Sequence, residues 1–531
     1  MPAIRMARSF FTVGVWTLAS RILGFVRDIL IAATMGAGPV AEAFLIAFSL
    51  PNMFRRFFAE GAFNMAFVPM FSKKVESGED PGGFAQDAFS GLGFLLLVFS
   101  VLAIVFMPVL VLAMASGFAD DARFDLAVLY GRVVFGYIFF ISLAALLSGV
   151  LNATGRFAAA AAAPVLLNVI LIVALLLADT GWFAEAISFG PEVMGDVPGV
   201  HHGDLVTIGV VVAGIGQLAL LLWAAKRAGY GFRITRPRLT PELKRLAIIA
   251  APAALAGGVV QVNLLVGRQV ASFFDGAVAW LSYADRLYQL PLGVVGIAIG
   301  IVLLPELSRR LQAEDTVGGR EAFNRAGEIA LALTVPAAVA LIVMPGPLVS
   351  VLFQRGAFDA EDTTATALAV AVYGAGLPAF VLQKVLQPLY FAREDTKRPF
   401  YFALVALIVN AAIAIGLAPV IGYIAAAVGT TVAGWAMTWL LWRGARGMGP
   451  ASEFDDRFCN RAPRILIAAV GMGAALYVVL MLAGPVFAVP TLRYGALALL
   501  VLFGIFAYAL FGRIARAFTV SEMTRSLRRR G

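Results

Sequence analysis

About fourteen stretches of this chain are apolar over some 20 residues or more. A helix of roughly 20 apolar residues crosses the ~30 Å hydrocarbon core of a bilayer. A helix also satisfies its own backbone hydrogen bonds where no water is present. The pattern therefore predicts an all-α polytopic membrane protein with about 14 transmembrane helices. The predicted spans lie near 10–34, 41–71, 89–115, 126–152, 157–178, 205–225, 244–274, 278–305, 327–353, 363–392, 400–419, 421–442, 463–486 and 491–512.

The composition agrees with this class. Hydrophobic residues make up 61% of the 531 residues and charged residues 14%, whereas a soluble domain is about half apolar and about a quarter charged. The single cysteine, Cys459, excludes a disulfide framework and a cysteine-ligated metal site. The adjacent His201 and His202 have no nearby cluster of ligands, so we interpret them as solvated and predict no metal site. We expect the N-terminus, where Arg21 and Arg27 interrupt the apolar run, to be a retained first span.

Basic residues fall in every second loop, which predicts the orientation of the chain. They include Lys73, Lys74, Arg156, the run from Lys226 to Arg245, Arg309, Arg310, Arg393, Lys397, Arg398, Arg443 and Arg446. Basic loops face the cytoplasm, so both termini are predicted to be cytoplasmic, as an even number of spans requires. The net charge of +9 is thus explained by these loops, and no nucleic-acid partner is expected.

A weak internal repeat at an offset of about 240 residues predicts two lobes. The segment "SLPNMFRRFFAEGAFNMAFVPMFSKK" in the second span corresponds to "QLPLGVVGIAIGIVLLPELSRR" in the eighth, and Asn168 corresponds to Asn410. Six spans separate the copies, so the lobes run parallel, an arrangement typical of transporters with a site between two bundles. We predict an N-lobe at 1–227, a C-lobe at 228–446 joined through the basic loop 226–245, and two accessory helices with a basic tail at 447–531.

Several charges lie inside the predicted spans. They are Arg21, Arg27 and Asp28 in the first span, Arg55, Arg56 and Glu60 in the second, Arg268 in the seventh, Asp285 and Arg286 in the eighth, and Lys384 in the tenth. An arginine at a helix centre costs about 2.5–3.5 kcal/mol on insertion scales. These side chains are therefore expected to face protein or a water-filled cavity.

Two interpretations of these charges remain open. Arg56 and Glu60 are spaced for an ion pair within one helix, and Asp28 is placed to neutralise Arg27 or Arg21. Pairing or snorkelling is favoured for Arg21, Arg56, Glu60 and Arg268. After each acidic residue is paired with an arginine, however, the charged residues inside the spans still have a positive net charge. Arginine also binds phosphate bidentately, so Arg27, Arg55 and Arg286 are predicted to bind an anionic, phosphorylated substrate in a cationic cavity.

Four separated motifs carry a family resemblance. They are "SRILGFVRD" at 20–28, "GAGPVAEAFLIAFSLPNMFRRFFAEGAFNMAFVPMF" at 36–71, "YADRLYQLPLGV" at 283–294 and "VLFQRGAF" at 351–358. In this order they resemble the MurJ (MviN) lipid II flippase family of the MOP superfamily. The resemblance implies two six-helix lobes around a central cavity. It also implies a bacterial inner-membrane protein of peptidoglycan and cell-wall biogenesis, and hence of cell shape, which transports undecaprenyl-pyrophosphate-linked lipid II to the periplasmic leaflet by alternating access.

The resemblance also implies roles for individual residues. Arg21, Arg27, Arg55 and Arg286 would line the cavity, with Arg27, Arg55 and Arg286 binding the pyrophosphate. Asp28, Glu42, Glu60, Asp285 and Lys384 are expected as supporting cavity residues. Spans one and eight would form a lateral portal, and spans thirteen and fourteen a groove for the lipid tail. The expected partners are lipid II and membrane lipids, with the chain a monomer.

The sequence departs from the family pattern at two places. Gln289 stands where some members have an acidic residue after the eighth-span arginine. Where some members bind sodium through carboxylates, the nearest matches are Asn263, Asn410 and Thr430, with Ala414 in place of a second acid. A sodium site is therefore in question, and we expect no cofactor, with coupling to the membrane potential or to a monovalent cation gradient.

Other classes of function are less compatible with the residues. A P-loop is missing from the sequence, which disfavours ATP hydrolysis. An enzyme would need acidic or histidine side chains gathered at one membrane face, so a non-enzymatic, secondary-type transporter is expected. A multidrug-type exporter of the same superfamily would be expected to have an acidic cavity, whereas the excess of arginine predicts a cationic one. A flippase for another polyprenyl-linked oligosaccharide remains an alternative, because its substrate carries the same pyrophosphate.

Overall fold

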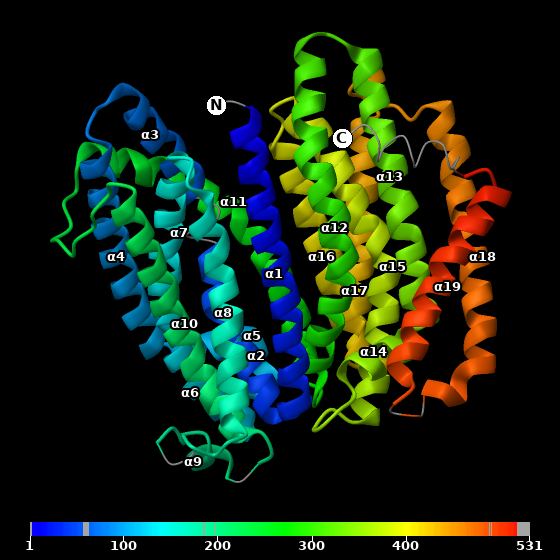
Figure 1. The fold of residues 1–531 in the computed structure, drawn as a ribbon, viewed down its shortest axis with the longest axis horizontal. Coiled ribbons are helices and arrows are strands. Elements are labelled where there is room, and N and C mark those ends of the chain that lie inside the picture. The colour runs from blue at the N-terminus through cyan, green and yellow to red at the C-terminus, as the bar shows by residue number, and fades with distance from the viewer. Residues whose placement is uncertain are drawn as a thin grey trace. The chain divides into compact units, whose positions relative to one another are not determined.

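The computed structural model describes residues 3–56, 63–183, 186–195, 197–487, 489 and 491–517, and all regular structure within these ranges is helical (Figure 1). Two short 3₁₀ turns, η2 (Ser116–Phe118) and η3 (Pro450–Ser452), accompany the α-helices. The α-helices are α1 (Ala3–Met35), α2 (Pro39–Arg55), α3 (Asn64–Ser77), α4 (Pro81–Val105), α5 (Met107–Ala115), α6 (Ala122–Phe135), α7 (Tyr137–Ala153), α8 (Phe157–Ala178), α9 (Pro191–Met194), α10 (Val200–Arg227), α11 (Pro241–Ala271), α12 (Ala277–Gln312), α13 (Thr316–Val343), α14 (Pro345–Phe353), α15 (Ala360–Phe391), α16 (Lys397–Ile421), α17 (Ile424–Ala445), α18 (Asp456–Phe487) and α19 (Arg493–Ile514).

The predicted all-helical membrane class is confirmed. Each predicted span lies on one helix or on two consecutive helices. Within the described ranges, ten helices are long and apolar enough to cross a membrane. The other four predicted spans correspond to α1, to α2 with α3, to α11 and to α12, which carry most of the charges predicted inside the membrane. The number fourteen therefore stays a prediction for these four.

The chain forms two compact units. Unit 1 comprises Met1–Ala279 and Arg355–Asp359, and unit 2 comprises Trp280–Gln354 and Ala360–Gly531. The predicted N-lobe ended at 227, whereas unit 1 extends through α11. The reason is packing: Gln269 of α11 accepts from the Ser116 amide at 2.7 Å and donates to the Leu112 carbonyl at 3.0 Å. The charge of the basic loop 226–245 does not determine which helices α11 contacts.

The two units repeat one packing order. In unit 1, α8 packs on α10, and α10 packs on α7. In unit 2, α16 packs on α17, and α17 packs on α15. The corresponding asparagines of the sequence repeat, Asn168 on α8 and Asn410 on α16, are both buried. This agreement supports the repeat that the sequence indicated only weakly.

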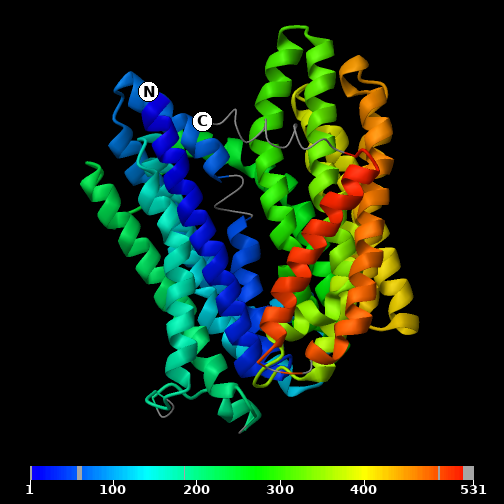
Figure 2. The same ribbon diagram turned by 45° about the vertical axis from the view of Figure 1, so that its right-hand side comes forward.

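The accessory helices α18 and α19 lie side by side in both ribbon views (Figures 1 and 2) and belong to unit 2, where they pack on α13 and α14. Their contact core includes Met472, Leu476 and Leu500 together with Met344, which directly follows α13. The Tyr508 hydroxyl of α19 donates to the Ala332 carbonyl of α13 at 2.9 Å. The pair is thus fixed to α13 and α14 by both apolar and polar contacts.

Close backbone contact in unit 1 explains part of the "VLFQRGAF" motif. The amide of Ala357 donates to the Ala33 carbonyl near the end of α1 at 2.8 Å. Gly356 has φ +58°, and a Cβ there would lie 2.1 Å from the Ala33 oxygen. Gly36 has φ +61°, and its Cβ would lie 2.5 Å from the Ala357 oxygen. Only glycine permits both this conformation and this approach, so segment 355–359 belongs to unit 1 through contact with α1.

Candidate functional site

The arginine that the sequence singled out in α1 is buried in a polar cluster. Arg27 and Asp28 are each 7% exposed. The Nε and Nη2 groups of Arg27 donate to Asp28 Oδ1 at 3.0 and 2.7 Å, and Nη1 donates to Asn168 Oδ1 at 2.9 Å. Of the two partners considered for Asp28, the structure thus selects Arg27. The ion pair and the hydrogen bonds stabilise this charged group inside the predicted first span.

The other predicted arginines of unit 1 are placed differently. Arg21, also on α1, is exposed. Arg55 is the last residue of α2 and is partly buried, and Arg56 caps that helix. Glu60, and with it the predicted Arg56–Glu60 pair, lies outside the described residues. The second predicted span contains α2 and α3, and residues 57–62 between them lie outside the described residues.

Unit 2 carries the remaining predicted site residues. Arg286 is an exposed residue of α12, and the partly buried Asp285 accepts a hydrogen bond from the Gln289 side chain one turn later. Gln289, which replaces an acidic residue of the family pattern, thus contacts the carboxylate that precedes Arg286. Lys384 is exposed on α15. The predicted binding of one pyrophosphate by Arg27, Arg55 and Arg286 together is not tested by contacts within either unit, and it stays a prediction.

Glu42 forms a buried ion pair that sequence reasoning missed. Glu42 is 1% exposed and accepts from Arg123 Nη1 of α6 at 2.9 Å and from the Val278 amide at 3.0 Å. Arg123 also contacts Asp121 and, at 2.9 Å, Asp275, and its guanidinium lies 4.5 Å from the Phe118 ring centroid. These contacts link α2, α6 and the start of α12 inside unit 1. Glu42 thus joins these three helices, and its supporting role in a cavity, which the resemblance implied, stays a prediction.

Two further polar contacts involve residues near the start of α10. His202, predicted to be solvated, has Nε2 2.9 Å from Asp179 Oδ1. Asp204 is fully buried at the start of α10. It accepts from the Tyr130 hydroxyl at 2.9 Å and from the Phe189 amide at 3.0 Å. Asp204 therefore anchors the loop before α10 to α6.

The residues of the possible ion site are divided between the units. Asn410 of α16 lies against α17, where a Cβ at Gly429 would be 2.7 Å from its Oδ1, and Thr430 follows Gly429 directly. The Thr430 hydroxyl donates to the Ala426 carbonyl of its own helix at 3.0 Å. Asn263 is on α11 and belongs to unit 1. The described ranges contain no group of three or more His, Cys, Asp or Glu side chains placed to hold a metal.

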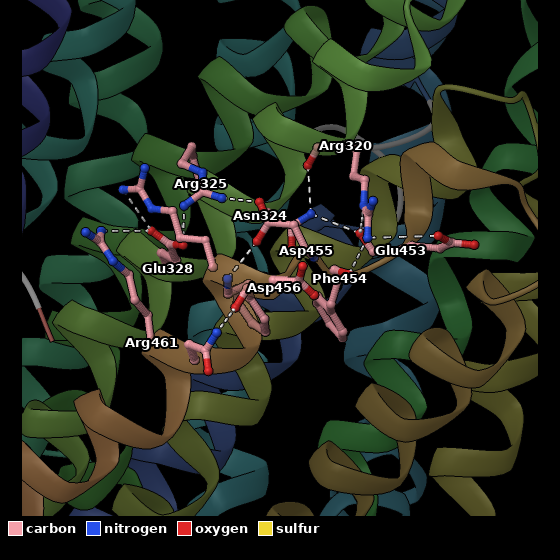
Figure 3. Close-up of polar contacts among 12 residues, drawn as sticks. Arg320, Asn324, Arg325, Glu328, Glu453, Phe454, Asp455, Asp456 and Arg461 are labelled. Carbon is pink, nitrogen blue, oxygen red and sulfur yellow. Dashed lines mark hydrogen bonds and ion pairs between the residues drawn. The ribbon is translucent and has the colours of Figure 1, made fainter.

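A second polar cluster, in unit 2, fixes α18 to α13 (Figure 3). The buried Glu328 of α13 pairs with Arg325 and, at 3.4 and 3.3 Å, with Arg457 and Arg461 of α18. Arg325 also pairs with Asp455, and Asp455 Oδ1 accepts from the Phe458 amide in the first turn of α18 at 2.6 Å. The accessory pair thus begins at a helix end that is both capped and ion-paired.

Asn324 holds the segment before α18 and provides a stability test of this cluster. It is fully buried, donates to the Glu453 carbonyl at 2.9 Å and accepts from the Asp455 amide at 3.1 Å (Figure 3). Asn324→Ala leaves both backbone groups without this partner, so we expect a loss of about 1–3 kcal/mol in the free energy of unfolding. Reversible unfolding in detergent measures the loss.

Asn460→Ala is the matched control for that variant. Asn460 is exposed, and its amide donates to Asp456 within α18. Substitution there is expected to change the free energy of unfolding by less than about 0.5 kcal/mol. Equal losses in the two variants would show that Asn324 does not hold the segment.

The fold and the buried charges define a class of protein: a multi-pass helical membrane protein with two units of repeated packing order and an ion-paired arginine inside its first span. The comparisons with known proteins give the family. The family model described as "Lipid II flippase MurJ" matches residues 31–495, and the chain belongs to this family. The resemblance stated from the motifs is thereby confirmed.

Curated relatives and solved structures agree with the assignment. A "Probable lipid II flippase MurJ" of Rhizobium meliloti is 43% identical, covering 99% of this chain and 96% of the relative. A "Lipid II flippase MurJ" of Burkholderia cenocepacia is 36% identical over 84% of this chain and 85% of the relative. A MurJ structure in an inward closed conformation matches with a TM-score of 0.76 at 24% identity, covering 94% of this chain and 98% of that chain. An inward-facing MATE transporter of the MOP superfamily matches with a TM-score of 0.64 at 15% identity, covering 80% and 94%. These two structures show the fold alone.

Proposed function

We propose that this chain is a lipid II flippase, which moves the undecaprenyl-pyrophosphate-linked peptidoglycan precursor from the cytoplasmic to the periplasmic leaflet of the bacterial inner membrane. Membership of the MurJ family supports this function. The observation within the chain that carries it is Arg27, a buried cation in a membrane-spanning helix that retains unused donors. Such a group suits an anionic head group that enters from the lipid.

The proposed binding chemistry follows from the guanidinium group. Arg27, Arg55 and Arg286 would each donate to pyrophosphate oxygens, and a planar fork of N–H donors matches two oxygens of a phosphate. Arg21, Asp28, Asp285 and Lys384 would tune the charge around them. The polyprenyl tail does not need to leave the hydrocarbon, so only the polar head requires a protein path.

We propose alternating access of a secondary-type transporter as the mode of transport. With the N- and C-termini and the basic loops in the cytoplasm, outward movement of an anionic head group is favoured by a membrane potential that is negative inside. The potential supplies about 2.3 kcal/mol per net elementary charge for each 100 mV. A monovalent cation at Asn410 and Thr430 would be an additional coupling ion, and we propose that the working unit is a monomer.

Cells depleted of their own lipid II flippase provide the test of function. Supplying this chain is expected to restore growth and the exposure of lipid II on the periplasmic face, measured with an enzyme that cleaves lipid II from outside the membrane. A chain that reaches the membrane at normal level but leaves the precursor inaccessible would refute the proposal. Restored transport of another polyprenyl-pyrophosphate oligosaccharide, without lipid II exposure, would favour the alternative substrate.

A further inference from the structure

The hydrogen bonds around Arg27 leave a defined part of its guanidinium available. An arginine has five N–H donors. Asp28 Oδ1 accepts two of them, from Nε and Nη2, and Asn168 Oδ1 accepts one from Nη1. Two N–H groups, one on each terminal nitrogen, are therefore not used by these three bonds. The plane of the guanidinium is fixed from two directions, by a carboxylate of α1 and an amide of α8.

Asn168 is itself held in one orientation. Its Nδ2 donates to the Ser20 carbonyl of α1 at 2.9 Å and to the Pro164 carbonyl of α8 at 3.2 Å. Two carbonyl oxygens can only face the NH₂ group of the amide, so Oδ1 must face Arg27. The amide is 5% exposed, and so it is a rigid, dry acceptor.

The chemistry of the second partner matters as much as its position. Asp28 already neutralises Arg27 as an ion pair, and a second carboxylate would repel an incoming anion. An amide oxygen directs the guanidinium without adding negative charge. A group that binds a diphosphate needs N–H donors in a fixed orientation. It also needs to keep as much of its positive charge as possible, because that charge attracts the anion.

From these contacts we infer that Asn168 is a positioning residue for the transported head group. It orients Arg27 so that the two remaining N–H donors bind a diphosphate bidentately, and it thereby favours diphosphate over monophosphate lipids. The inference rests on the proposed function, because it assumes that Arg27 binds the head group. Asn168 acts through Arg27 and does not need to touch the substrate.

The test compares binding of undecaprenyl pyrophosphate and undecaprenyl phosphate to the purified full-length chain in detergent micelles. Asn168→Ala removes a hydrogen bond to a charged group, so we expect affinity for the pyrophosphate lipid to fall about tenfold or more. Affinity for the monophosphate lipid is expected to change by less than about threefold, because a single phosphate can turn to meet two donors of a reoriented guanidinium, whereas the two linked phosphates have less freedom to do so. Asn168→Asp keeps the size of the side chain and adds a negative charge, so it is expected to lower the affinity for both lipids. If the alanine variant does not fold, the isosteric Asp variant provides the test, because unchanged affinity for both lipids would contradict the need for an uncharged acceptor at this position.

Gln217→Ala is the matched control. Gln217 is a buried amide of unit 1 that also bonds the backbone of α8, with Nε2 2.7 Å from the Ala163 carbonyl, and it bonds the Tyr137 hydroxyl instead of an arginine. Its loss is expected to lower stability and to leave the diphosphate-to-monophosphate affinity ratio unchanged. If Asn168→Ala also leaves the ratio unchanged while Arg27→Lys lowers it, the positioning function is refuted and the flippase proposal stands. If neither variant changes the ratio, both the positioning function and the binding function of Arg27 are refuted.

Discussion

Alanine at Arg27, Arg55 or Arg286 is expected to abolish support of growth in cells that depend on this chain. Each substitution removes charge-assisted hydrogen bonds to the pyrophosphate, worth about 1.5–3 kcal/mol, so lipid II affinity should fall about 10- to 100-fold. The Arg55→Ala and Arg286→Ala chains should still reach the membrane at a normal level. Plating efficiency and the amount of chain in the membrane fraction measure the two quantities.

Two further substitutions separate binding from folding. Arg27→Ala leaves the buried Asp28 without the partner that both Nε and Nη2 provide, so Arg27→Lys is the better probe: it keeps a positive charge and loses the fork. Arg309→Ala is the control on α12, because Arg309 is exposed and pairs with Glu306 in its own helix. If cells grow normally with Arg55→Ala, Arg286→Ala and Arg27→Lys, these arginines only hold helices together.

Arg123→Ala is expected to cause the largest loss of stability in unit 1. It leaves Glu42, 1% exposed, without its charged partner. Removing one member of a buried ion pair costs about 3–5 kcal/mol. Reversible unfolding in detergent micelles should show this decrease in the free energy of unfolding, together with less full-length chain in the membrane.

The same cluster contains the controls for this variant. Asp275 also contacts Arg123, but its side chain is 95% exposed, so Asp275→Ala is expected to cost no more than about 1 kcal/mol. A double variant, Arg123→Met with Glu42→Gln, removes both charges and keeps an acceptor for the Val278 amide. It should recover most of the stability. A small effect of Arg123→Ala alone would contradict the assignment of Glu42 to a buried pair.

The local and repetitive features of the fold were predictable from the sequence. Apolar length predicted helices at every span, because a helix must satisfy its backbone groups inside a bilayer. Asp28 was a predicted partner of Arg27 or Arg21, and the structure pairs it with Arg27. The helices α2, α12 and α15 continue through Pro51, Pro291 and Pro388, the prolines that the sequence placed inside spans.

The contacts between distant segments were not predictable in the same way. Glu42 and Arg123 are 81 residues apart, and nothing in the spacing of either span connects them. The grouping of α11 with unit 1 depends on its contacts with the segment after α4, which loop charge does not encode. Asn168 did carry a signal, since a single amide in the otherwise apolar stretch "PVLLNVILIV" needs a hydrogen-bond partner inside the membrane. The sequence could not identify Arg27 as that partner.

Reconstitution tests the central claim most directly. The purified chain is inserted into lipid vesicles that carry fluorescent lipid II, and the label in each leaflet is followed with a quencher that cannot cross the membrane. We predict that the wild-type chain equilibrates lipid II between the leaflets, that Arg309→Ala does the same, and that Arg286→Ala leaves the distribution unchanged. Equal rates for the wild-type chain and Arg286→Ala would contradict the arginine-dependent transport of lipid II.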